Sequence, residues 1–153
     1  MPTFTTHRQI AHSANEMFDL VSDIELYPEF LPMCEALTVR SRKKYGEKTL
    51  LLADMTVGYK VIRETFTTQV FLQPEESLIE VRYIDGPFKY LENRWAFHNI
   101  GDKNVCDVEF FIDYEFKNKM LGLVVGAMFD VAFRKFTDAF EVRAHKIYGF
   151  PED

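Results

Sequence analysis

The sequence predicts an α+β fold in which a curved, seven-stranded antiparallel sheet grips one long C-terminal helix, with two short helices after the first strand. Between Glu35 and Phe116, apolar and polar residues alternate with a period of two, in segments separated by short turn signals. The segment Met120 to Tyr148 contains no proline and repeats its apolar residues at helical steps of three, four and seven. With 153 residues, the chain is expected to form a single domain, residues 1–153, around one core.

The first strand and the first helix are predicted from the N-terminal residues. Thr3 to Ile10 is rich enough in β-branched residues for a strand. Ser13 and Glu16 then form a capping box, in which each side chain accepts the backbone N–H of the other residue. Apolar residues follow at helical spacing, and the helix is expected to end before Tyr27-Pro28, because a residue that precedes proline disfavours the helical conformation.

The segment YPEFLPMC, Tyr27 to Cys34, allows one short helical turn at most between its two prolines. It carries more large apolar side chains than a solvated loop tolerates: Tyr27, Phe30, Leu31 and Met33. We expect these side chains to cap either the edge of the core or the mouth of a cavity.

Six further strands are predicted, at Leu37–Lys44, Thr49–Gly58, Lys60–Leu72, Leu78–Ile84, Tyr90–Ile100 and Cys106–Phe116. The last of them alternates most regularly, which is typical of a strand with one buried face and one mostly wet face. Connections this short place consecutive strands side by side in a meander. A straight helix touches a curved sheet over part of its length only, and a gap lined by aromatic residues would be an apolar pocket.

The long C-terminal helix has two apolar faces over its first half. One stripe follows the whole helix: Val125, Phe129, Ala132, Phe133, Phe136, Phe140 and Ile147. The opposite face is charged from Arg134 onward but apolar before it: Met120, Leu123, Val124, Ala127 and Val131. Either a loop or second subunit covers this second face, or it meets a lipid-like ligand, a membrane surface or a partner. Asp130 and Arg134-Lys135 interrupt the run, so a transmembrane span of about 20 apolar residues is not expected.

Composition excludes several classes of protein. A net charge of −6 argues against a general nucleic-acid binder, since phosphate binding needs a basic surface. The one basic run, RSRKK at Arg40 to Lys44, is interpreted as a solvated turn between strands. Cys34 and Cys106 lie far apart and form no CxxC pair, which favours a reducing compartment. The N-terminus has no signal-peptide pattern, so we expect a cytoplasmic protein. A second expectation is that the protein also contacts the inner membrane peripherally.

The polar residues do not indicate an enzyme. The four histidines are scattered without metal-ligand spacing, and no nucleophile elbow, phosphate-binding glycine loop or dinucleotide fingerprint is present. Four groups on predicted strands are candidates for an acid or base inside a cavity, although most are expected to face solvent: Asp54, Glu64, Glu80 and His98. Glu64 is unusual because it shares a face with Ile62 and Phe66. It would pair with a cation, point at the end of the cavity or mark a shift in register.

Three motifs resemble a known family. YPEFLPMCE at Tyr27 to Glu35 resembles the signature of the coenzyme Q-binding protein and ribosome association toxin family, within the START-like, or polyketide cyclase/dehydrase and lipid transport, superfamily. HSANEMFDLVSDIELYP and GPFKYLENRWAF, the latter at Gly86 to Phe97, support the resemblance, which extends from about Thr3 to Gly149. It implies a helix-grip fold.

The resemblance also implies two roles. One is the binding of ubiquinone in an apolar cavity, in support of respiratory electron transport and without catalysis. The other is a toxin-like binding of ribosomes that blocks subunit association. Related folds host cyclases, which leaves a cavity enzyme as a lesser alternative. We expect a ubiquinone-type lipid as the ligand, no required cofactor and no metal. The candidate ligand-binding residues are Phe30, Leu31, Phe88, Trp95, Phe97, Val125, Phe129 and Phe133.

Overall fold

The computed structural model describes residues 3–59, 61–101 and 104–149. Its strands are β1 (Thr3–Ile10), β2 (Cys34–Tyr45), β3 (Lys48–Tyr59), β4 (Ile62–Gln73), β5 (Leu78–Asp85), β6 (Phe88–Asn99) and β7 (Cys106–Phe116). Its helices are α1 (Ala14–Ser22), the 3₁₀ helices η1 (Ile24–Glu29) and η2 (Pro74–Glu76), and the long α2 (Lys119–Tyr148). The predicted order of elements and the fold class are confirmed.

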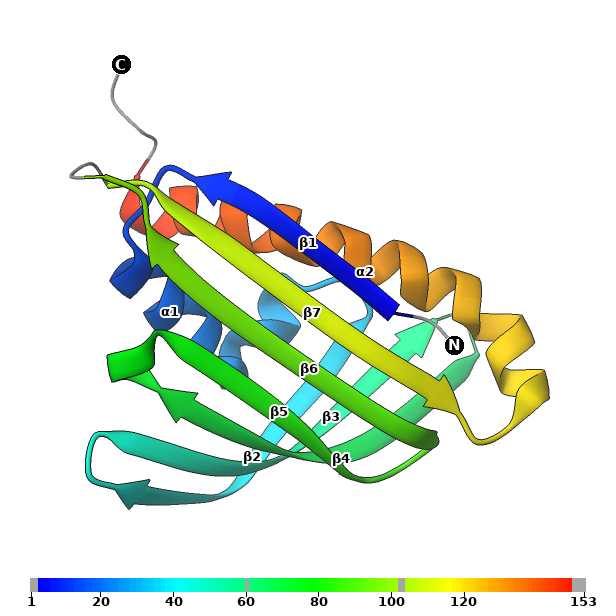
Figure 1. Cartoon of the computed structure of the whole chain (residues 1–153). Coiled ribbons are helices and arrows are strands. Elements are labelled where there is room, and N and C mark those ends of the chain that lie inside the picture. Colours follow the sequence, from blue (N-terminus) through cyan, green and yellow to red (C-terminus); the bar gives the residue numbers. More distant parts are fainter. Residues whose placement is uncertain (1–2, 60, 102–103, 150–153) are drawn as a thin grey trace.

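The seven strands form one antiparallel sheet in the order β1-β7-β6-β5-β4-β3-β2. Strands β2 to β7 follow one another as a meander, and β1 adds to the free edge of β7. Figure 1 shows that the sheet curves and that α2 lies across its concave side, with α1 and η1 beside the C-terminal end of α2. Among the strands, α2 lies closest to β7 and β1, so the concave surface of β2 to β5 is left for other side chains to cover.

Strand β7 shows how the sequence pattern becomes a core. All of its even-numbered residues, from Cys106 to Phe116, are buried, whereas the odd-numbered residues are partly exposed. The predicted alternation is therefore confirmed along the whole strand. Six inward side chains on a central strand give the concave face an apolar floor, which is the surface that α2 packs against.

The predicted capping box is present at the start of α1. The Glu16 backbone N–H donates to the Ser13 hydroxyl at 3.1 Å, and the Ser13 N–H donates to the Glu16 carboxylate at 3.0 Å. The end of the helix differs from the prediction. The chain leaves the helical conformation at Asp23, and Ile24 begins η1, which contains Pro28. Because of this break, Ile24 points into the core from η1 rather than from the last turn of α1.

Most predicted strand limits are correct within three residues. Strand β2 begins at Cys34 rather than at Leu37, because a hydrogen bond from Gly58 N to Met33 O, 2.9 Å long, continues the pairing of β2 with β3 to the end of the strand. The predicted start of the strand that corresponds to β4, Lys60, lies outside the described residues.

Helix α2 turns the predicted stripe toward the core except at its last member, although Phe133 and Phe136 are only partly buried. Val125, Phe129 and Phe140 are buried, but Ile147 is 48% exposed, which corrects the prediction for that residue. The last turn packs against α1 through polar groups instead, since the Tyr148 hydroxyl donates to the Glu16 backbone carbonyl at 3.1 Å.

The polar contacts that join α2 to other elements are concentrated in its C-terminal half. Arg8 on β1 forms ion pairs with Asp138 and with Glu141, the latter at 3.3 Å. Arg143 pairs with Glu29 of η1 at 3.0 Å. Within the described chain, no hydrogen bond or ion pair joins residues 119–137 of α2 to another element. Apolar packing holds that first half in place, together with the Arg134 guanidinium, which lies 5.0 Å from the ring centroid of Phe4 on β1.

Candidate functional site

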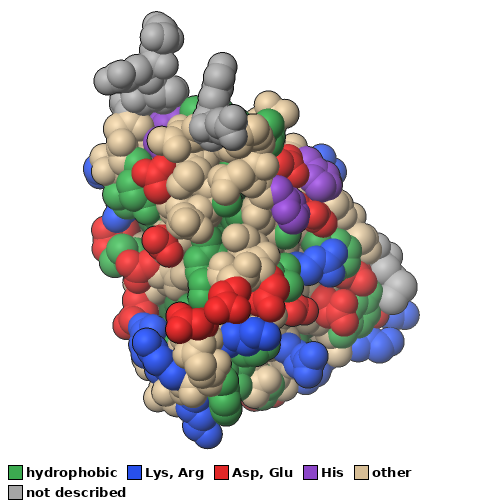
Figure 2. Space-filling view, turned by 60° about the vertical axis from the view of Figure 1, so that its left-hand side comes forward, with side chains coloured by type: hydrophobic (Ala, Val, Ile, Leu, Met, Phe, Trp, Pro, Cys, Tyr) green, Lys and Arg blue, Asp and Glu red, His purple; other side chains and the backbone are tan. Residues whose placement is uncertain are grey.

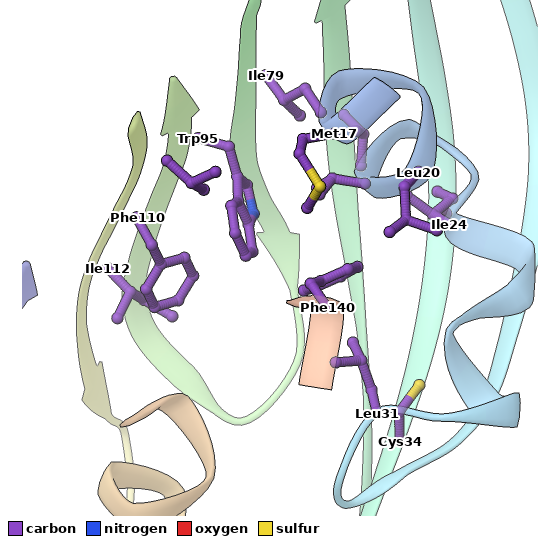
Figure 3. Close-up of a cluster of buried hydrophobic side chains, with 14 of the residues drawn as sticks. Met17, Leu20, Ile24, Leu31, Cys34, Ile79, Trp95, Phe110, Ile112 and Phe140 are labelled. Carbon is purple, nitrogen blue, oxygen red and sulfur yellow. The ribbon is translucent and has the colours of Figure 1, made fainter. Parts of the chain in front are cut away.

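A cavity lies between α2, the loop after η1 and the concave face of the sheet. It encloses about 100 Å³ of space that the centre of a water molecule can occupy. Side chains from the sheet form its floor, among them Phe66, Val70, Ile79, Val81, Leu91, Ile112. Aromatic residues of α2 form the opposite wall: Phe129, Phe133, Phe136 and Phe140. Figure 3 shows Ile79, Trp95, Phe110, Ile112 and Phe140 pointing toward a common centre from β5, β6, β7 and α2.

Aromatic contacts hold this wall together. Trp95 lies 4.6 Å from Phe110 and 5.1 Å from Phe140 between ring centroids, the latter in an edge-to-face arrangement. Phe133 meets Phe136 edge to face at 5.3 Å. Because these rings come from the sheet and from α2, they set the distance between the two layers and keep space open beside them.

One side of the cavity is its mouth. Four lining residues that solvent partly reaches lie close together, in the loop after η1 and on β2 and β3: Pro32, Met33, Leu37 and Met55. Leu37 and Met55 face each other as register partners. Met33 adopts a positive φ of 67°, and its loop fills a position that α2 does not reach. Of the four side chains expected to cap either the edge of the core or the mouth of a cavity, Tyr27, Leu31 and Met33 line the cavity, whereas Phe30 does not.

The described residues that line the cavity include no charged side chain. Apart from the indole N–H of Trp95, the polar groups on the wall belong to Tyr27, Thr68 and Asn93. The Tyr27 hydroxyl donates to the Val21 backbone carbonyl. Burial raises the pKa of Tyr27 well above its ordinary value, so this phenol stays neutral.

Groups close to the cavity are also neutral near pH 7. Burial raises the pKa of the Cys34 thiol to about 11. Burial, followed by the negative charge of Asp130, raises the pKa of Tyr114 to about 12. An environment that opposes ionisation in this way suits a neutral ligand and gives no ready acid or base for catalysis.

Five of the eight predicted ligand-binding residues line the cavity: Leu31, Phe88, Trp95, Phe129 and Phe133. The structure brings these residues together from the loop after η1, from β6 and from α2. Their role in binding a ligand stays a prediction.

The other three do not line the cavity, for different reasons. Phe30 lies on the outer side of Phe140, with the guanidinium of Arg143 5.0 Å from its ring centroid. Phe97 is covered by α1, where it meets Phe18 edge to face at 5.9 Å. Val125 is buried one helical turn before Phe129, at which the cavity wall begins.

The four candidate acids and bases on the strands also lie away from the cavity. Glu64 is on the inner face of β4, as its pattern predicted, but it is half-buried opposite Val57 and does not reach the cavity. The strand continues past the part of the sheet that the helices cover, which explains a carboxylate on this face. On the outer face, Asp54 accepts from Thr67 at 2.6 Å and pairs with Arg40. Glu80 and His98 are exposed.

Sequence reasoning missed Thr68 and Asn93, the polar residues inside the cavity. A signal for Asn93 was present, because Leu91, Asn93, Trp95 and Phe97 share one phase of the strand alternation. A single asparagine in an otherwise apolar phase indicates a polar group on the inner face. Thr68 gave no such signal, since threonine is common on both faces of strands.

The second apolar face of α2 is exposed. Leu123 is 80% and Val124 59% exposed, and Met120, Ala127 and Val131 are also exposed. We call these five residues the outer ridge. The first turns of α2, which carry it, lie at the right-hand edge of the molecule in Figure 1. No described loop covers them.

The basic run RSRKK lies within strand β2, so its interpretation as a turn is wrong, although the run is exposed to solvent. Arg40 pairs with Asp54, and Arg42 pairs with Glu25 of η1, so two of its four charges have acidic partners. Figure 2 shows acidic side chains across the middle of one face of the molecule and basic side chains below them. The run therefore belongs to a mixed surface rather than to an extended basic one.

The described residues hold no group of three or more His, Cys, Asp or Glu side chains placed to bind a metal ion. They also contain no helix long and apolar enough to cross a membrane.

Comparison with known proteins gives two kinds of relative. The chain is 34% identical over 149 residues to the Ribosome association toxin RatA of Escherichia coli (strain K12), covering 97% of this chain and 90% of that protein. It is also 34% identical over 151 residues to the mitochondrial Coenzyme Q-binding protein COQ10 of Drosophila melanogaster, covering 97% of this chain and 60% of that protein.

One solved structure and one family model also match this chain. The solution structure of the 18 kDa protein CC1736 from Caulobacter crescentus is similar to this chain with a TM-score of 0.80 and 30% identity, covering 98% of this chain and all of the other. The model of the family described as polyketide cyclase / dehydrase and lipid transport matches residues 10–141. The chain therefore belongs to this family, with the START-like helix-grip fold that its motifs indicated.

Proposed function

We propose that this protein binds a neutral isoprenoid lipid of the ubiquinone type in the cavity beneath α2 and leaves it chemically unchanged. The observation that carries the proposal is the cavity itself, which is lined by aromatic and aliphatic side chains and by no described charged residue. A relative at 34% identity is named a coenzyme Q-binding protein, which supports this choice of ligand. In that role the protein would support respiratory electron transport.

The size of the cavity constrains how such a ligand binds. An apolar cavity of about 150 Å³ holds benzene, so the 100 Å³ here accommodates a short piece of an isoprenoid tail, whereas a substituted ring needs side chains of the wall to move. A longer tail must leave by the mouth at Met33 and Met55 or displace side chains of the wall. Each part of the tail that leaves water contributes about 25 cal/mol per Å² of apolar area.

The proposed mechanism is sequestration. A reaction would need a positioned acid, base or nucleophile beside the ligand, and the ionisable groups on the wall and next to it, Tyr27 and Cys34, are held neutral by burial. The apolar wall would supply affinity, and its few polar groups would orient the ring.

We further propose that the outer ridge contacts an anionic membrane surface while the ligand enters or leaves. Four basic residues flank the ridge, against one acidic residue within residues 117–135: Lys117, Lys119, Arg134 and Lys135. This excess of positive charge contrasts with the net charge of −6 for the whole chain. An apolar helix face with basic residues at its borders is the arrangement that binds at the interface of anionic bilayers.

Organic extraction of the purified protein, followed by mass spectrometry, tests the lipid proposal. We expect a quinone with an isoprenoid tail in near-stoichiometric amount, or saturable binding when a short-tailed ubiquinone is added to protein without ligand. An empty extract together with no binding on addition would refute the proposal.

A second candidate function is the binding of ribosomes, favoured by the 34% identity to the Ribosome association toxin RatA. Its candidate contact is the basic run on β2, in which Lys43 and Lys44 form no ion pair with the described residues. Sedimentation with separated ribosomal subunits tests it. We expect Lys43→Glu combined with Lys44→Glu to release the protein from the subunits, and co-sedimentation that these changes leave intact would exclude the run as the contact.

A further inference from the structure

One hydroxyl on the cavity wall, that of Thr68, has no hydrogen-bond partner among the described residues. Thr68 lines the cavity from β4 and is 5% exposed. Its hydroxyl oxygen is not one of the described side-chain atoms that are cut off from solvent without a partner, so the hydroxyl is open to the cavity. A hydroxyl that faces an otherwise apolar cavity can form a hydrogen bond with a polar group of a ligand.

Asn93 presents a second polar group to the same cavity. Its Nδ2 donates to the Phe111 backbone carbonyl at 2.8 Å. Because a carbonyl only accepts, the amide must direct its nitrogen toward Phe111, which uses one of the two N–H donors and leaves the second N–H able to donate and the Oδ1 oxygen able to accept. Asn93 is half-exposed although β6 is an interior strand, as expected for a side chain that borders a cavity.

Sheet register fixes how these two groups are placed. Val70, Val81 and Asn93 form one row across β4, β5 and β6, and Thr68 lies two residues from Val70 along β4. With strands about 4.8 Å apart and a rise of about 3.3 Å per residue, the two backbones are roughly 12 Å apart. The concave face directs both side chains toward the same space, with apolar Val70 and Val81 between them. A ring with oxygens at opposite positions matches this spacing.

The charge of the site restricts the ligand further. A carboxylate or phosphate in this cavity would lose its hydration, and none of the described lining residues offers a positive charge in exchange. Fatty acids and phospholipid headgroups are therefore poor ligands, whereas a neutral ring with hydroxyl or carbonyl oxygens is a good one.

We propose that Thr68 and Asn93 form the headgroup site of the cavity, and that Asn93 Oδ1 accepts a hydrogen bond from a ring hydroxyl. The site then binds a hydroquinone more tightly than the corresponding quinone, because a ring hydroxyl can both donate to Oδ1 and accept from the second N–H of Asn93, whereas a quinone carbonyl can only accept and leaves Oδ1 without a donor. Thr68 serves either form, since its hydroxyl both donates and accepts. This inference depends on the proposed binding of a neutral lipid, and it specifies which oxidation state of that lipid binds more tightly.

Binding of three probes with the same tail tests the inference: decylubiquinone, its hydroquinone under anaerobic conditions, and decylbenzene, which has no oxygen. Trp95 is the single tryptophan of the chain and lines the cavity, so quenching of its fluorescence reports on the quinone directly. The other two probes are measured by competition. We expect the hydroquinone to bind most tightly.

Two variants separate the headgroup site from general apolar binding. Thr68→Val and Asn93→Leu should each weaken hydroquinone binding by roughly three- to tenfold, the usual effect of one neutral hydrogen bond. Neither should change the affinity for decylbenzene. Thr65→Val makes the same chemical change on the exposed outer face of β4 and serves as the matched control.

The outcomes distinguish this inference from the function on which it depends. If the unaltered protein binds none of the probes, the lipid-binding function itself fails. If it binds all three but the quinone is preferred, or if Thr68→Val and Asn93→Leu bind the hydroquinone as the control does, the headgroup site is refuted while apolar binding stands. Equal losses for all three probes would indicate damaged packing and would also overturn the assignment.

Discussion

At the scale of single residues, a pair of histidines joins the two ends of the domain. His12, which is buried after β1, and His145 of α2 are 2.9 Å apart between Nε2 and Nδ1. One of the two rings must be neutral to accept this hydrogen bond. Burial and the positive charge of His145 lower the pKa of His12, whereas the carboxylates of Glu16 and Glu141 oppose the shift. The ring of Tyr148 also packs against His12, with 5.7 Å between centroids.

This lowered pKa predicts a loss of stability in acid. A histidine whose pKa is lower in the folded state than in the unfolded chain stabilises the fold above its ordinary pKa of about 6.5. That contribution is lost as the pH falls from there through the lowered value. We expect the free energy of unfolding of the protein, relative to His12→Gln, to decrease between pH 7.5 and 5, as measured by urea denaturation.

His7 provides a control of opposite sign. Its exposed ring pairs with Asp107 at 3.0 Å, and this hydrogen bond raises the pKa of His7, so its small contribution is present in acid and is lost as the pH rises. His7→Gln should therefore make the acid decline steeper. A decline that His12→Gln leaves unchanged would contradict the role of the buried pair.

At the scale of elements, α2 divides into two halves with different surfaces. Both halves expose large apolar side chains, but the first half groups five of them in the outer ridge, whereas Val142 stands among charged residues at 66% exposure. If the ridge meets an anionic membrane, one negative charge placed within it should weaken binding to that membrane. The same charge at Val142 should leave the binding unchanged.

Val124→Asp and Val142→Asp are therefore a matched pair on one helix. We expect Val124→Asp, like Leu123→Asp, to reduce binding to vesicles that contain anionic phospholipid by roughly tenfold, because a valine or leucine side chain no longer leaves water. Flotation of protein with the vesicles measures this. Val142→Asp should bind as the unaltered protein does. Equal binding by all four proteins would remove the membrane from the proposal and leave a protein partner for the ridge.

Much of the element level could be predicted from the sequence because local signals agreed with one another. The capping box at Ser13, the alternation in β7 and the helical repeat of α2 each depend on residues close together in the chain. The error at Ile147 has a different origin. Its position in the repeat is correct for the stripe, but nothing local shows that the last turn of α2 contacts α1 and His12 through Tyr148 and leaves Ile147 exposed.

At the scale of the whole molecule, the meander could be predicted because short connections leave few alternatives. The contents of the cavity could not. The free volume is a small difference between the space inside a curved sheet and the volume of many side chains, and packing decides it rather than pattern. For the same reason, two similar side chains in apolar segments differ in position: Phe129 lines the cavity, whereas Phe30 packs against Phe140 and does not line it.

The uneven attachment of α2 has a consequence for how the domain moves. Its second half is fastened to β1, η1 and α1 by ion pairs and hydrogen bonds, while its first half, which carries Phe129, Phe133 and the outer ridge, is held by apolar contacts. Local opening costs least where few polar contacts must break. Backbone amides of residues 121–131 should therefore exchange with deuterium sooner than those of residues 137–147. The N-terminal half of α2 would then move away from the sheet while its C-terminal half stays attached. This movement would open the side of the cavity that Phe129 and Phe133 line.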